Sequence, residues 1–288
     1  MNPATWRRIE TIPSWRRAHR LFRRLPEPVR APLRIAASPV WSGVVRLVLG
    51  RSGGRVVSGP FTGNTLDLSP VSQRHLLSYL LGTTELEIRP VVEKIVKRGY
   101  RTILNIGAAD GYYAVGFASR SPGTRIVAFE AKEELHPALA RIGQLNGVAD
   151  RITIRGLCDE TVLRGALQDS SDTLVLMDIE GAEKALLDPA KVSELARVDV
   201  LVETHDVFAP GCTEALIARF SPTHDIERHR QRPRVLADFP TSFLPSLPRL
   251  APRIAVALLD ERRFGTQEWL HMTLRRPTAA ASARSATT

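Results

Sequence analysis

The chain has 288 residues and a formal net charge of +10, and 43% of its residues are hydrophobic, which is ample for a buried core. This length allows one large α/β domain with appendages, and no apolar run approaches the ~20 residues that a membrane-spanning helix needs. The start lacks the long apolar core of a signal peptide. Cys158 and Cys212 provide neither a disulfide framework nor a CxxC metal pair, so we predict a cytoplasmic location.

The positive charge is concentrated at the start of the chain. Residues 1–55 hold twelve of the 40 basic residues and two of the 30 acidic ones, so residues 56–288 carry 28 of each and are formally neutral. Tryptophans and aliphatic residues alternate with arginine pairs, which predicts one or two short amphipathic helices in an Arg-rich N-terminal extension. A solvated arm, a peripheral contact with a membrane surface and a contact with nucleic acid all fit this composition.

The next elements are a hairpin and a helix. "SGPFTGNTLDLSP" predicts a hairpin with its turn at Gly63 and Asn64. A helix is expected at about 85–98, and Gly99 is suited to its C-cap.

From Tyr100 onward the pattern alternates between strand and helix. Strands are predicted at 101–106, 125–130, 151–157, 173–180 and 198–205, and helices at about 111–119, 133–145, 183–187, 192–196 and 213–220. The strands are apolar without polar alternation, which predicts a parallel sheet with helices on both faces.

The last part of the chain is less regular. The proline-rich segment 238–253 is predicted to be a loop or lid, 268–276 a closing strand, and 277–288 a disordered tail. The predicted organisation is therefore an extension (1–55), one folded domain (56–276) and the tail.

The stretch "NIGAADGYYAVG" follows the first strand of this domain and opens a helix. Backbone N–H groups at such a turn are expected to be free for a ligand. The G-x-x-x-G spacing of Gly107 and Gly111 lacks the G-x-G-x-x-G pattern of dinucleotide sites and suits S-adenosylmethionine, although turn glycines can also be purely structural.

Two acids further along the chain could complete a cofactor site. Glu130 ends the second strand, where an acid commonly accepts hydrogen bonds from ribose hydroxyls. Asp159, just beyond the third strand, could reach an adenine amino group. A solvated strand end and an ordinary loop acid are the respective alternatives.

Four polar residues lie at the ends of strands four and five: Asp178 and Glu180 in "MDIEGAE", and Glu203 and His205 in "VETH". Side chains alternate along a strand, so each pair is expected to lean one way. If the two strands are neighbours, the four groups converge at one rim of the sheet. Such a cluster is costly beside an apolar sheet unless it binds something.

Together, the segment from Gly82, the glycine turn, "FE", "MDIEGAEKALL" and "VETH" resemble the FkbM-type family of S-adenosylmethionine-dependent methyltransferases. The resemblance runs from about Gly82 to His205. It implies the α/β, Rossmann-like class I methyltransferase fold, with a mostly parallel seven-stranded sheet and helices on both faces. It also implies methylation of a hydroxyl group, often on a sugar, a glycolipid or a secondary metabolite.

The resemblance extends to single residues. It assigns Gly107, Asp110 and Gly111, with Ala108 beside them, to the cofactor turn and Glu130 to the ribose, while Asp178 and Glu180 match the family's strand-four acids. Asn105 stands where the family usually has Asp, and it lacks the charge that a carboxylate offers to the cofactor's amino group.

A hydroxyl acceptor requires a base for methyl transfer. We predict Asp178 or His205 as that base, with Glu180 and Glu203 orienting it or the substrate. A magnesium ion held by several of these carboxylates is a rival arrangement, and His205 as a simple strand cap is another.

Two other functions stay open at this point. One is RNA methylation with the arginine-rich arm, against which the neutral body weighs. The other is a non-catalytic scaffold with a degenerate cofactor site, which Asn105 would explain.

Overall fold

The computed structural model describes residues 39–68, 76–168, 172–261 and 267–275. The helices predicted before residue 39 and the tail 277–288 lie outside the described residues. The chain divides into two compact units, Met1–Arg51 and Ser52–Thr288. The described part of the first unit lies in helix α4 (Pro39–Ser52). Within the described ranges, no helix combines the length and apolarity that crossing a membrane requires.

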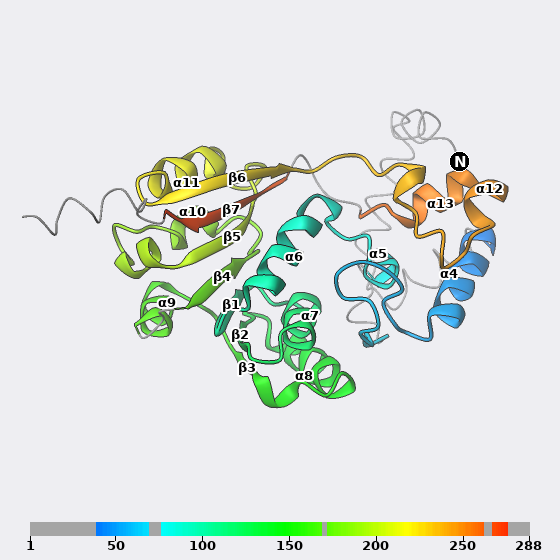
Figure 1. Ribbon diagram of the computed structural model, residues 1–288, viewed down its shortest axis with the longest axis horizontal. Coiled ribbons are helices and arrows are strands. Elements are labelled where there is room, and N and C mark those ends of the chain that lie inside the picture. Colours follow the sequence, from blue (N-terminus) through cyan, green and yellow to red (C-terminus); the bar gives the residue numbers. More distant parts are fainter. Residues whose placement is uncertain (1–38, 69–75, 169–171, 262–266, 276–288) are drawn as a thin grey trace, which may run out of the picture. The chain divides into compact units, whose positions relative to one another are not determined.

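The second unit is built on a seven-stranded sheet (Figure 1). Its strands are β1 (Thr102–Ile106), β2 (Arg125–Phe129), β3 (Ile152–Arg155), β4 (Thr173–Met177), β5 (Asp199–Thr204), β6 (His224–Arg230) and β7 (Glu268–Leu274). They lie in the order β3-β2-β1-β4-β5-β7-β6, and β7 runs antiparallel to both of its neighbours. The pairs among β1–β5 are all parallel. This is the strand order of class I methyltransferases, so the predicted fold class is confirmed.

Helices cover both faces of this sheet (Figure 1). The core on one face joins Leu104 and Ile106 of β1 to apolar side chains of α9 (Glu160–Leu167), α10 (Glu183–Leu186) and α11 (Cys212–Phe220). The helices α6 (Arg89–Arg98), α7 (Tyr112–Arg120) and α8 (His136–Leu145) complete the layer on the other face. Both layers bury apolar strand residues, which explains the unalternating runs in the sequence.

The remaining helical segments are short. They are α5 (Leu76–Leu81), α12 (Leu247–Leu250), α13 (Pro252–Leu258) and the 3-10 turns η2 (Leu86–Ile88), η3 (Glu133–Leu135), η4 (Ala149–Arg151), η5 (Ser193–Arg197) and η6 (Leu236–Asp238). The loop predicted at 238–253 is therefore wrong over α12 and over the start of α13, at 252 and 253. Both helices carry proline in their first turn, where the missing N–H has no helical partner to lose.

The structure differs from the sequence predictions at four other places. The strand predicted at 173–180 ends at Met177, and β6 was not predicted because its sequence, "HDIERHR", is mostly polar. The helix α9 was also missed. In place of a hairpin turning at Gly63, Arg55 forms an isolated antiparallel bridge with Thr65. The predicted helix cap is confirmed, because Gly99 is left-handed and donates to Ile95.

Candidate functional site

The glycine turn after β1 is tied to the end of β2. The N–H groups of Gly107 and Ala108 both donate to the Phe129 carbonyl at 2.9 Å, and the Ala109 N–H donates to Glu130 Oε2 at 2.9 Å. The expectation that these turn N–H groups are free is therefore wrong. The turn is held in place by the strand beside it before any ligand arrives.

Close packing of the chain explains why glycine occupies two positions of this turn. Gly107 has φ +84°, and a Cβ there would lie 1.8 Å from the Asp178 carbonyl oxygen. Gly111 has φ +95°, and a Cβ there would lie 2.9 Å from a side-chain carbon of Leu139. Gly107 thus allows direct contact between the turn and the chain leaving β4. These two glycines therefore have a structural role. The close approach at Gly107 also brings the two halves of the predicted site together.

Glu130 is a buried carboxylate that organises this turn. Its Oε2 accepts from Ala109, and its Oε1 accepts from the Lys132 N–H at 2.8 Å. A carboxylate offers about four lone-pair positions, so two remain for a ligand. The position at the end of β2 is compatible with the predicted ribose contact, which stays a prediction.

Asp159 and Asp110 occupy different environments. Asp159 is exposed and caps α9, because its Oδ1 accepts from the Val162 N–H at 2.8 Å. Asp159 therefore has a structural role as the N-cap of α9, and its contact with adenine stays a prediction. Asp110 is buried in the turn, and its charge helps to raise the pKa of Tyr79, whose burial is the larger cause.

Asn105 lies on β1 just before the turn and is only 3% exposed. Its side-chain oxygen accepts no hydrogen bond from any described residue. A buried acceptor without a partner is costly, so a donor from a ligand would stabilise this position.

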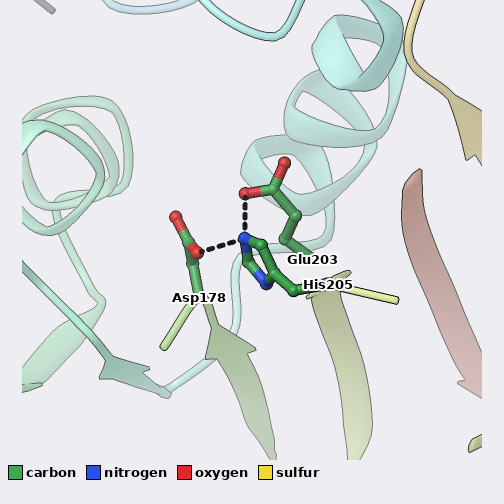
Figure 2. A group of neighbouring side chains, drawn as sticks. All are labelled: Asp178, Glu203 and His205. Atoms are coloured by element: carbon green, nitrogen blue, oxygen red, sulfur yellow. Dashed lines mark ion pairs between the residues drawn. The ribbon is translucent and has the colours of Figure 1, made fainter. Parts of the chain in front are cut away.

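The ends of β4 and β5 bring three of the four predicted polar residues together, as Figure 2 shows. His205 Nε2 lies 3.6 Å from Asp178 Oδ1 and 3.5 Å from Glu203 Oε2. The side chains of His205 and Glu203 are 1% and 3% exposed, whereas that of Asp178 is 35% exposed. Asp178 is thus the member of this cluster that a substrate can reach most directly. We call Asp178, Glu203 and His205 the polar centre.

Glu180 does not belong to the polar centre. Because β4 ends at Met177, the alternation expected to place Glu180 beside Asp178 does not apply. Glu180 has a left-handed backbone with φ 57° and is exposed. It acts on His205 only through its charge, which helps to raise the pKa of the imidazole.

Glu183 takes the place expected for Glu180. Its fully buried carboxylate accepts a hydrogen bond from His205 Nδ1 at 2.7 Å and further bonds from the N–H groups of Ile179 and Gly181. Burial acts to raise the pKa of Glu183, but the hydrogen bond and charge of His205 outweigh it, and the pKa is lowered. An ionised carboxylate only accepts, so Nδ1 of His205 carries the proton.

The pKa of His205 shifts the other way. Burial acts to lower it, but the hydrogen bond to Glu183 and the charge of Asp178 outweigh burial, and the pKa is raised. Sequence reasoning missed Glu183, although it is the last acid of "MDIEGAE". The motif contained this acid, but the sequence did not show that Glu183, at the start of α10, faces His205.

Two aromatic side chains near the site were also missed. Phe208 stacks on His205 with ring centroids 6.0 Å apart and is 52% exposed. Tyr79 stacks on Tyr112 of α7 at 4.1 Å. Tyr79 and Tyr112 lie on segments that only the fold brings together. Phe208 lies three residues after His205, in a turn where its N–H donates to the His205 carbonyl at 2.9 Å.

Comparison with known proteins gives structural likeness only. No protein-family model and no curated protein matches the chain. The O-methyltransferase TomG of Streptomyces achromogenes, solved with S-adenosylmethionine, is 14% identical, with a TM-score of 0.44 over 72% of this chain and 92% of that one. An O-methyltransferase of Bacillus cereus, in complex with S-adenosylhomocysteine, is 13% identical, with a TM-score of 0.41 over 82% of this chain and 91% of that one.

A fibrillarin/Nop5p complex is also similar, with 12% identity and a TM-score of 0.42 over 66% of this chain and 84% of that one. Identities this low do not carry a substrate from one protein to another, so function has to be inferred from the site itself.

Proposed function

We propose that the chain is an S-adenosylmethionine-dependent O-methyltransferase of the FkbM type, acting on a hydroxyl of a sugar, a glycolipid or a secondary metabolite. One observation carries the proposal: the turn after β1 and the polar centre are in direct contact. Gly107 lies against the Asp178 carbonyl, and the Asp178 N–H donates to the Ile106 carbonyl at 3.0 Å. A cofactor on the turn would therefore present its methyl group beside Asp178.

The reaction asks two things of these residues. An acceptor oxygen donates an electron pair to the methyl carbon while the carbon–sulfur bond breaks, and sulfur keeps that bond's electrons to yield S-adenosylhomocysteine. The acceptor must also lose its proton. Asp178 is the most exposed member of the polar centre, so we assign the proton to its carboxylate, with His205 and Glu203 behind it.

Calorimetric titration with S-adenosylhomocysteine tests the proposal. The wild-type chain should bind, and Glu130→Gln should weaken binding roughly tenfold, because a charge-assisted hydrogen bond is worth about 1.5–3 kcal/mol. Glu133→Gln is the matched control, since Glu133 is an exposed acid three residues away in η3. Absence of binding by wild type at high micromolar concentration would favour the scaffold alternative.

The RNA alternative receives no support from the neutral body of the chain. It is tested by retention on an RNA column with and without the Arg-rich extension. Specific retention that requires residues 1–55 would revive that alternative, and equal behaviour of the two chains would remove it.

A further inference from the structure

The donor atoms of the polar centre have the spacing of ligands around one ion. One atom each from Asp178, Glu203 and His205 lies within 4.8 Å of the other two, and Nε2 is 3.5 and 3.6 Å from the carboxylate oxygens. Two ligands that each lie about 2.0–2.3 Å from the same ion are separated by about 3–4 Å. A single cation could therefore contact all three groups.

The imidazole is aimed into this space. In Figure 2 both contacts to the carboxylates end on the same ring nitrogen, Nε2. Nδ1 is occupied by Glu183 at 2.7 Å, while both Nε2 contacts exceed the roughly 2.7–3.2 Å of an N–H···O hydrogen bond. A 99% buried ring thus points an atom with no hydrogen bond to any described residue between two carboxylates.

The hydrogen bond to Glu183 is the arrangement that metal-binding histidines use. Their second ring nitrogen usually donates to a carboxylate or a carbonyl, which fixes the tautomer and leaves the other nitrogen's lone pair for the metal. Here Glu183 is itself held by the N–H groups of Ile179 and Gly181. The direction of Nε2 is therefore set by the loop after β4.

The donor set also narrows the choice of ion. Magnesium, the rival arrangement that the sequence left open, prefers oxygen ligands, whereas one nitrogen with two carboxylates suits manganese, iron or zinc. Asp178 is partly exposed, so the open side of the centre can admit a further ligand.

We propose that Asp178, Glu203 and His205 bind one divalent transition-metal ion, with Glu183 positioning His205. If the proposed function holds, on which this step rests, the ion would take the acceptor's hydroxyl oxygen as a further ligand. An ordinary carboxylate is a weak base toward an alcohol, and a bound cation lowers the pKa of a coordinated hydroxyl. The proton would then leave to the second oxygen of Asp178 at the open rim.

Manganese is the probe for this site. The full chain, stripped with a chelator, is titrated with Mn²⁺ while the signal of free Mn²⁺ is followed by electron paramagnetic resonance. We expect one ion per chain and at least a tenfold loss of affinity in Asp178→Asn. Glu183→Gln should lose about 10–100-fold, because it supports a ligand. Glu180→Gln, which removes a nearby exposed charge outside the polar centre, should bind within about threefold of wild type.

Thermal melting of each variant verifies folding, and Asp178→Asn is chosen because it keeps the shape of a partly exposed side chain. Absence of Mn²⁺ binding by wild type would overturn the metal site, as would equal losses in Asp178→Asn and Glu180→Gln. Titration of the same metal-free protein with S-adenosylhomocysteine separates the two proposals. Cofactor binding without Mn²⁺ binding leaves the methyltransferase standing and removes the ion, whereas Mn²⁺ binding alone does the opposite.

Discussion

Two buried histidines of one sheet differ in their surroundings. His205 follows β5 and donates from Nδ1 to Glu183, and its pKa is raised because that bond and nearby carboxylates outweigh burial. His271 lies within β7, paired in register with Leu201 of β5, and neither ring nitrogen has a partner among the described residues. Burial lowers its pKa. Burial alone therefore does not set the direction of a histidine's pKa shift, and a carboxylate at hydrogen-bond distance can reverse it.

The position in the sheet explains the difference. Parallel strands end together at one edge, where their loops can bring acids from β4, β5 and α10 around one ring. Within the antiparallel pair of β5 and β7, the neighbours of His271 are mainly strand residues. We therefore expect substitutions on the His205 side to affect function and those on the His271 side to affect folding.

The largest expected effect separates the two histidines by activity. His205→Gln should lower transfer of labelled methyl groups into an acceptor fraction by about 10²–10⁴-fold, the usual range for loss of a group that assists proton transfer. His271→Gln should stay within about twofold of wild type. Equal losses in the two variants, with both folded, would contradict the comparison.

The contact between the turn and Asp178 should be the next most sensitive feature. Gly107→Ala forces a left-handed residue against the Asp178 carbonyl and should cost about 2–4 kcal/mol of unfolding free energy. Gly123→Ala is the control, because a Cβ at Gly123 meets nothing within 4 Å. Urea denaturation compares the unfolding free energies of the two variants. A Gly107→Ala variant as stable as wild type would show that the turn and the chain at Asp178 can move apart.

Removing the carboxylate that distinguishes His205 should have a smaller effect. Glu183→Gln loses a charge-assisted hydrogen bond at a fully buried position, so we expect about 1.5–3 kcal/mol of destabilisation. Urea denaturation measures it, with Glu133→Gln in η3 as an exposed-acid control. An unchanged midpoint would mean that Glu183 and His205 gain nothing from their contact.

Asn105 resembles His271 in being buried with an atom that has no partner among the described residues, but it lies beside the glycine turn. Asn105→Asp would add the negative charge that the FkbM-type family, which the sequence resembles, usually has at this position. We expect up to about tenfold tighter binding of S-adenosylhomocysteine, about 1.4 kcal/mol, together with lower stability of the unliganded chain, because the new charge is buried. Weaker binding would argue that Asn105 does not face the cofactor.

The smallest effect concerns acid stability. Glu227, Lys94, Asp199 and His229 are the charged or titratable groups that act on His271, and burial outweighs the acids and lowers its pKa. The unfolded chain therefore takes up this proton more readily, so the contribution of His271 to stability is present above about pH 6.5 and is lost as pH falls below it. His271→Phe should flatten this part of the pH profile by under about 1 kcal/mol. An unchanged profile between pH 7.5 and 5.5 would contradict the assignment.

Local patterns predicted the centre of this fold better than its borders. β1, β2, β4 and β5 are short, largely apolar runs, β3 alternates between apolar and polar residues, and each of the five was predicted near its observed position. β6 was not predicted because it is an edge strand with exposed side chains, and its charged residues are also typical of a loop. The proline-rich helices escaped because proline breaks a helix only in its interior.

The sequence alone determined the apolar strands, the glycine turn and the presence of acids and a histidine after β4 and β5, because each depends on neighbouring residues. The tertiary structure decided which of these groups meet. The left-handed turn at Glu180 sends that acid outward and brings Glu183 from α10 onto His205, and the missing Cβ of Gly107 lets the turn reach Asp178. Such contacts depend on the path of the backbone after a strand ends, where the alternation of side chains no longer applies.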